Sequence, residues 1–90
     1  MQAVKIRVFG LVQGVGFRYS TKMIADKLAI TGIVWNISDG TVKIIAQGAD
    51  EQLQKFIQAI KASPSPFANV ERIEVESTQP DPTLHGFRTA

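Results

Sequence analysis

Residues 50–61 read DEQLQKFIQAIK, and this stretch carries the clearest structural pattern of the chain. Its apolar side chains recur at positions i, i+3, i+4 and i+7, which places them on one face of an α-helix. Those residues are Leu53, Phe56, Ile57 and Ile60. Acidic residues at positions 50 and 51 and a lysine at position 61 complement the helix dipole. The pattern predicts an amphipathic helix that packs one face against a core.

Shorter patterns on both sides of this helix predict a second helix and several strands. Alternating apolar and polar residues indicate half-buried strands, and the turn residues SDG at 38–40 separate the two strands of a hairpin. Phe17, Ile24 and Leu28 recur at helical spacing before Gly32. In chain order the predicted elements are strand 4–8, helix 17–29, strand 33–36, strand 41–47, helix 50–61, strand 70–77 and an optional short strand 86–88.

This order, β-α-β-β-α-β with an optional short fifth strand, is typical of the ferredoxin-like fold, an α+β sandwich. In that fold two helices cover one face of an antiparallel sheet. The strand at 70–77 suits such a sheet, because Ile73 and Val75 alternate with charged residues that would face solvent. Ferredoxin-like domains host many unrelated activities, so the fold alone predicts no function.

The composition describes a small folded protein. Ninety residues, 44% of them hydrophobic, predict a single domain over residues 1–90 and exclude a disordered chain. No apolar run approaches the ~18–20 residues of a membrane-spanning helix, and Lys5 and Arg7 interrupt any secretory signal. The lack of cysteine excludes disulfides, thiolate metal sites and a cysteine nucleophile. We therefore expect a cytoplasmic protein.

The net charge of +2 hides an uneven distribution. Residues 1–45 hold six lysines and arginines against two acids, whereas residues 46–90 hold four against six. The positive excess in the first half is compatible with an anionic ligand there, and equally with an ordinary mixed-charge surface. No cluster of lysines and arginines indicates a nucleic-acid-binding segment.

The segment GLVQGVGFR, residues 10–18, joins the first strand to the first helix and is rich in glycine. The dinucleotide motif GxGxxG would need a glycine at Tyr19 and the P-loop one at Val15, so neither motif is present. Glycines still let backbone N–H groups converge on an anion at a helix N-terminus. Arg18 in the first turn costs roughly 0.3–1 kcal/mol unless an anion lies beside it. The alternative is a tight turn followed by a surface arginine.

Residues 10–18 closely resemble the phosphate-binding signature of the acylphosphatase family. A second segment, GIVWNISDGTV at residues 32–42, is similar to that family's G-x-V-x-N-x-x-D-G-x-V pattern. The resemblance extends over essentially the whole chain. It implies hydrolysis of the carboxyl–phosphate bond of small acyl phosphates to a carboxylate and inorganic phosphate, without a metal or an organic cofactor.

The resemblance also implies roles for particular residues. Arg18 would bind the phosphoryl group, and Asn36 would hold the attacking water. The phosphate-binding loop would consist of Gln13, Gly14, Val15, Gly16, Phe17 and Arg18. Ile33 stands where many relatives carry an aromatic residue, and Trp35 where a polar or basic residue is frequent. These two departures concern substrate preference and rate rather than the reaction.

The inventory of reactive side chains suits such a reaction. One histidine, His85, no cysteine and no acidic cluster are a poor set for hydrolysing a phosphate monoester, which usually needs an acid or a metal. An acyl phosphate expels a carboxylate whose conjugate acid has a pKa of roughly 4, so it leaves at neutral pH without a proton. Positioning and charge stabilisation then suffice. The resemblance implies that a phosphate oxygen of the substrate accepts the proton of the water.

Three other functions stay open. A ferredoxin-like nucleic-acid binder would carry aromatic residues on its central strands, but VKIIA at residues 42–46 has none. A regulatory module would bind anions without turnover, and a carbamoyl-phosphate-acting domain of the hydrogenase-maturation type shares the first motif. We expect a monomer that acts on a small-molecule acyl phosphate and binds neither nucleic acid nor membrane.

Overall fold

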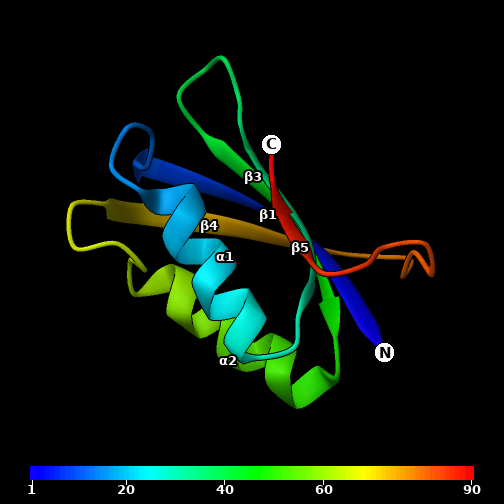
Figure 1. Cartoon of the computed structure of the whole chain (residues 1–90). Helices are drawn as coiled ribbons and strands as arrows, with labels where there is room; N and C mark the ends of the chain where they lie inside the picture. Colours follow the sequence, from blue (N-terminus) through cyan, green and yellow to red (C-terminus); the bar gives the residue numbers. More distant parts are fainter.

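The computed structural model describes residues 1–90 and contains every predicted element, including the short fifth strand (Figure 1). In chain order the elements are β1 (Gln2–Leu11), α1 (Phe17–Lys27), β2 (Thr31–Asn36), β3 (Val42–Gly48), α2 (Asp50–Lys61), β4 (Asn69–Thr78) and β5 (Phe87–Thr89). Strands β1 and β4 extend beyond the predicted ranges at both ends. Helix α1 ends before residue 29, because Ala29 adopts a left-handed conformation with φ 56°.

The strands form one sheet in the order β4-β1-β3-β2-β5, which confirms the ferredoxin-like prediction. The four longer strands pair antiparallel, whereas β5 pairs parallel to β2, so the sheet is mixed. The strand directions explain why β5 runs parallel to β2. Strand β4 ends at the end of the sheet where β2 begins, and the chain therefore enters β5 running in the same direction as β2.

Both helices cover the same face of the sheet and enclose the core between the two layers (Figure 1). The apolar residues predicted for α2 are all buried, and burying each contributes roughly 1.5–3 kcal/mol. Helix α1 buries Phe17, Thr21 and Ala25, while the predicted Ile24 and Leu28 are only partly buried. The buried face is thus shifted from the predicted one, because small residues let a helix approach its neighbours closely.

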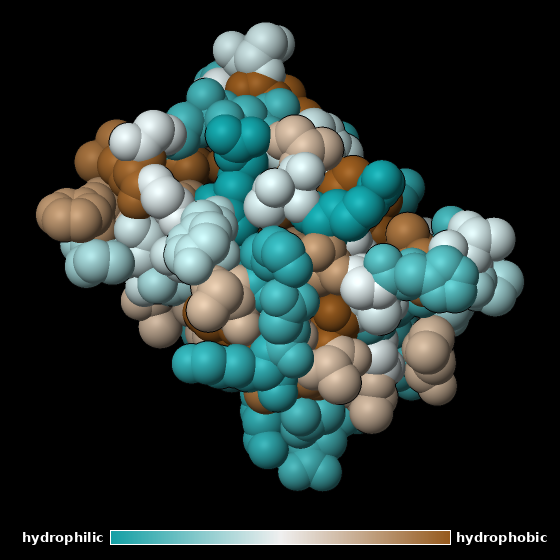
Figure 2. Space-filling view, in the orientation of Figure 1, coloured by the Kyte–Doolittle hydropathy of each residue, from teal (hydrophilic) through white to brown (hydrophobic).

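The outer surface of the helical layer is mostly hydrophilic along its middle, and hydrophobic residues gather near the upper left edge of the view (Figure 2). Tyr19 and Met23 of α1 are among the exposed large hydrophobic residues. Single exposed apolar side chains are normal on protein surfaces. None of the helices has the length and the apolar content to span a membrane.

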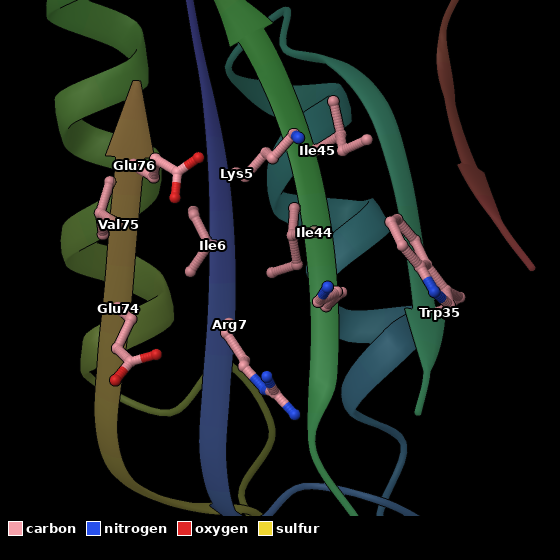
Figure 3. A pocket seen from close by; sticks show the side chains of 10 residues that line it. Lys5, Ile6, Arg7, Trp35, Ile44, Ile45, Glu74, Val75 and Glu76 are labelled. Carbon is pink, nitrogen blue, oxygen red and sulfur yellow. The ribbon is translucent and has the colours of Figure 1, made fainter. Parts of the chain in front are cut away.

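The opposite face of the sheet carries charged residues of both signs around a cavity of about 400 Å³ (Figure 3). Acidic residues of β4 lie beside basic residues of β1, since Glu76 pairs with Lys5 and Glu74 with Arg7 in the register. Val75, expected on the covered face, is 45% exposed because β4 is an edge strand. This face therefore carries charges of both signs close together.

Candidate active site

The loop between β1 and α1 presents a run of backbone N–H groups that have no partner in the chain. Gly14 and Gly16 have φ angles of +72° and +76°, a left-handed conformation that other residues rarely adopt. Gly16 directly precedes α1, and no side chain caps this end of the helix. The N–H groups of residues 13–19 donate no hydrogen bond to another residue. Donors without a partner at a helix N-terminus are suited to bind an anion.

Hydrogen bonds of two side chains hold this loop in place: Gln13 of the loop itself and Ser65 from outside it. Gln13 donates from Nε2 to the carbonyl oxygens of Ile37 at 2.7 Å and of Thr41 at 2.9 Å, which ties the loop to the β2–β3 hairpin. Ser65, which is 3% exposed, donates from Oγ to the carbonyl oxygen of Val15 at 2.6 Å. These contacts use a side chain and a carbonyl group of the loop, so its N–H groups stay free.

The β2–β3 hairpin carries Asn36 at the end of β2, next to Ile37. Its turn is held by Asp39, whose Oδ1 accepts hydrogen bonds from the Thr41 hydroxyl at 2.6 Å and the Thr41 N–H at 2.9 Å. Arg7 of β1 forms an ion pair with Asp39 and donates from Nε to the Thr41 hydroxyl at 3.3 Å. The two Thr41 bonds, and then Arg7, lower the pKa of Asp39 to about 2. This carboxylate is therefore engaged in shaping the turn.

Arg18 and Asn36 line the same cavity of about 480 Å³ at the N-terminus of α1. The other residues that line it are Val12, Gly14, Gly16, Phe17, Tyr19, Lys22 and Thr89. In Figure 1 the loop before α1 and the tip of the β2–β3 hairpin lie at the same end of the sheet. Two of the predicted loop residues do not line the cavity, namely Gln13 and Val15, and these two make the anchoring contacts.

The charge that lines this cavity is entirely positive. Arg18 and Lys22 are its charged residues, and no carboxylate lines it. The first turn of α1 contains no acidic residue, so the helix dipole adds to the positive potential. Arg18 donates from Nη1 to the main-chain oxygen of Ala90 at 2.7 Å, which places its guanidinium group beside the end of β5. His85 is exposed in another loop, and no group of three or more His, Asp or Glu side chains is placed to hold a metal ion.

Sequence reasoning missed several residues of this region. They are Tyr19, Lys22 and Thr89 at the cavity and Ser65 behind the loop. Lys22 had a detectable signal, since it follows Arg18 by four positions in a predicted helix and therefore shares its face. Thr89 and Ser65 had none, because segments far away in the sequence bring them to the loop.

A ferredoxin-like sheet with a glycine-rich β1–α1 loop and a cationic cavity defines the class of small α+β proteins that suit an anionic ligand at a helix N-terminus. The family model for acylphosphatase matches residues 4–89. An acylphosphatase from Latilactobacillus sakei is 52% identical over 86 residues, which are 96% of this chain and 94% of that protein. The chain belongs to the acylphosphatase family of hydrolases.

Solved structures share this fold over the whole chain. The crystal structure of acylphosphatase from Bacillus subtilis matches with a TM-score of 0.94 at 42% identity, covering 100% of this chain and 99% of that one. Full-length HypF, in a phosphate- and nucleotide-bound form, matches with a TM-score of 0.86 at 34% identity. That match covers 99% of this chain and 12% of HypF. The five-stranded ferredoxin-like fold is therefore common to these proteins.

Proposed function

We propose that this chain hydrolyses the carboxyl–phosphate bond of small acyl phosphates, with a carboxylate and inorganic phosphate as products. The observation that carries the proposal is that Arg18, Asn36 and the glycine-rich loop line one cavity. The free N–H groups of residues 13–19 add donors to this arrangement. Membership of the acylphosphatase family supports the reaction class.

The phosphoryl group is bound by the loop and by Arg18. The N–H groups of residues 13–19 supply donors along the loop, and the guanidinium group supplies a planar fork that matches two phosphate oxygens. One nitrogen of Arg18 contacts the main-chain oxygen of Ala90, which leaves other N–H donors for the substrate. These donors are fixed by the fold before the substrate arrives, so they stabilise the charge on the phosphoryl oxygens without reorganisation.

Asn36 positions the attacking water. Its backbone is held by the pairing of β2 with Val42 of β3, and its side chain amide both accepts and donates a hydrogen bond. The water approaches phosphorus in line with the departing carboxylate. Because the water is already positioned, the reaction step has a lower entropy cost. Asn36 is therefore assigned to the water and Arg18 to the phosphoryl group.

The reaction balances without a protein base. The water oxygen forms a bond to phosphorus while the bond between phosphorus and the acyl oxygen breaks, and the electron pair leaves with the carboxylate. The water proton passes to a phosphoryl oxygen of the substrate. This route fits a cavity that no carboxylate and no histidine lines.

The setting of the reaction stays a prediction from the sequence. We expect residues 1–90 to act as one domain and as a monomer in the cytoplasm. We also expect neither a metal nor an organic cofactor to be required, because the leaving group is a weak base.

Hydrolysis of benzoyl phosphate tests the proposal, with wild type, Arg18→Ala and Asn36→Ala compared with and without EDTA. We expect EDTA to have no effect and each variant to lose about 10²–10³-fold in kcat. Inorganic phosphate should still bind to Asn36→Ala, because this residue serves the water, whereas Arg18→Ala should bind it weakly. A wild-type rate equal to that of buffer contradicts the proposal, and strong inhibition by EDTA contradicts the metal-free route.

A further inference from the structure

We propose that Lys22 forms a subsite for a second negative charge, so that the enzyme prefers acyl phosphates whose acyl group carries its own carboxylate. This inference rests on the proposed function, because it takes the phosphoryl group to lie at Arg18 and the loop of residues 13–19. It concerns a side chain at the cavity that the hydrolytic mechanism does not use.

The position of Lys22 on α1 brings its ammonium group near the acyl part of a bound substrate. Lys22 lies one helical turn beyond Arg18 and lines the same cavity. Side chains four positions apart on a helix have Cβ atoms about 5–6 Å apart. The Lys22 side chain is 39% exposed, so it is partly enclosed yet accessible to a ligand. Its flexible stem reaches groups that lie beyond the phosphoryl group.

The charge balance of the cavity also favours a second anion. Arg18, the N-terminus of α1 and the free N–H groups already provide donors for one phosphoryl group. Lys22 adds a further positive charge, and Asp26, its one partner in the chain, does not line the cavity. A cavity whose charged lining residues are all cations favours a ligand with a negative charge near each of them.

The one partner of Lys22 in the chain does not remove this capacity. Nζ of Lys22 lies 2.8 Å from Oδ2 of Asp26, one turn further along α1. The Asp26 side chain is 47% exposed and does not line the cavity. Exposed pairs of this kind are weak, and an ammonium group has more donors than this one contact uses. Lys22 can therefore bind a substrate carboxylate while it keeps Asp26.

The expected ligand class is an acyl phosphate of a dicarboxylic acid in which a few carbon atoms separate the carboxylate from the phosphoryl group. Benzoyl phosphate and 3-carboxybenzoyl phosphate form a matched pair of probes. The rigid ring keeps the added carboxylate away from the acyl carbon, so both compounds present the same reacting group. The ratio of their kcat/KM values then measures the subsite.

We expect the wild-type kcat/KM for 3-carboxybenzoyl phosphate to be about threefold to fivefold higher than that for benzoyl phosphate, mainly through a lower KM. Lys22→Met should bring this ratio to about one, and Lys22→Glu should invert it. Added salt should reduce the ratio of the wild type, because it screens exposed charges. Lys55→Met is the matched control, since Lys55 forms a similar pair with Glu51 on α2 and does not line the cavity. Its ratio should equal that of wild type.

Two results would overturn the proposal that Lys22 forms a subsite. One is a wild-type ratio at or below one, and the other is an equal loss on both substrates in Lys22→Met, which would assign Lys22 to the phosphoryl group. If neither substrate is hydrolysed, the proposed function fails instead. Binding of benzoylphosphonate and 3-carboxybenzoylphosphonate, measured by calorimetry, then tests the subsite through the ratio of the two Kd values. Equal Kd values in the wild type would overturn it.

Discussion

Two cavities of this molecule are similar in size and differ in the charges that line them. The cavity on the open face of the sheet, about 400 Å³, is lined by lysines and an arginine together with Glu74 and Glu76. The cavity at the N-terminus of α1, about 480 Å³, is lined by Arg18 and Lys22 and by no carboxylate. On the open face, Arg7 forms an ion pair with Asp39, and Lys5 lies opposite Glu76 in the register. Only the cavity at α1 combines lining cations with backbone N–H donors that have no partner in the chain.

The contrast teaches that unbalanced charge, rather than cavity size, distinguishes the candidate site. Charges that meet their opposites across neighbouring strands gain modest stability and solubility. Cations that share a cavity with unpaired N–H groups at a helix N-terminus lie where one anion can contact both kinds of donor. The predictions below test this comparison with variants in or beside the two regions and with matched controls elsewhere.

The largest effect is expected from Arg18→Lys, which keeps the charge and removes the planar fork. We expect kcat/KM for an acyl phosphate to fall about 10²–10³-fold, because one lysine ammonium cannot replace bidentate contacts with phosphate oxygens. Arg72→Lys on β4 is the matched control, since Arg72 is exposed and pairs with Glu74 outside the cavity. Steady-state kinetics of both variants check the prediction. Equal losses in the two variants would contradict the distinction between the regions.

A smaller effect is expected from Gln13→Ala, which releases the loop from the β2–β3 hairpin. The change leaves the carbonyl oxygens of Ile37 and Thr41 without this donor and should cost about 1–3 kcal/mol of unfolding free energy. We expect kcat/KM to fall about tenfold or more as well, because the position of the loop relative to Asn36 is no longer fixed. Urea unfolding and steady-state kinetics measure the two effects.

Gln47→Ala is the control for this loop variant. Gln47 is buried and makes two hydrogen bonds of 2.8 Å with the backbone of Asp81, away from the α1 cavity. It should lose a comparable free energy of unfolding and keep its kcat/KM. Loss of activity in proportion to stability in both variants would show that Gln13 acts through stability alone.

The hairpin turn should respond to acid through Asp39. Its pKa is lowered from 3.8 to about 2, chiefly by the Thr41 hydroxyl, so the folded state favours the ionised carboxylate. This stabilisation is fully present above the unfolded pKa near 3.8 and is lost as pH falls through about 2. The stability difference between wild type and Asp39→Asn should therefore be largest above pH 4 and shrink towards pH 2, as measured by thermal unfolding across pH.

Asp81→Asn is the control for the acid response. Hydrogen bonds from Thr83, its side chain first, lower the pKa of Asp81 in a loop that does not line the α1 cavity. Both variants should flatten the acid response, but only Asp39→Asn should also change the activity measured near neutral pH, because Asp39 shapes the hairpin that carries Asn36. Unchanged activity in Asp39→Asn would show that Asn36 does not depend on the turn.

The smallest effect is expected from Glu74→Gln on the open face. Its pair with Arg72 is exposed on both sides, and such pairs contribute about 0–1 kcal/mol. We expect a change in unfolding free energy below about 0.5 kcal/mol and no change in kcat/KM. A larger loss of activity would mean that the open face takes part in the reaction.

Much of the fold was predictable because its elements are encoded by local patterns. Helix α2 follows from a helical spacing of apolar residues, and the hairpin follows from its turn residues between two strands. The buried face of α1 was less predictable, since it includes the small residue Ala25 and the polar residue Thr21. The parallel pairing of β5 depends on the directions of strands that are distant in the sequence.

The candidate site, like the fold, was predictable only in part from the sequence. Arg18 and Asn36 were identified from two motifs, and the structure places both at one cavity. Ser65, by contrast, lies in a segment that reads as an ordinary loop, although its hydroxyl binds the carbonyl oxygen of Val15 from 50 residues away. Gln13 was predicted as a loop residue, while its side chain instead ties the loop to the hairpin.

The sequence by itself determined the order of the elements, the glycine-rich loop before α1 and the two residues proposed for the chemistry, because neighbouring residues express these features. Only the tertiary structure decided which charges meet an opposite charge on a distant segment. Arg7 and Arg18 look alike in the sequence, yet Arg7 meets Asp39 across the sheet, and Arg18 lines a cavity without a carboxylate. Coulombic pairing depends on distances of a few ångströms, and the packing of distant segments sets those distances.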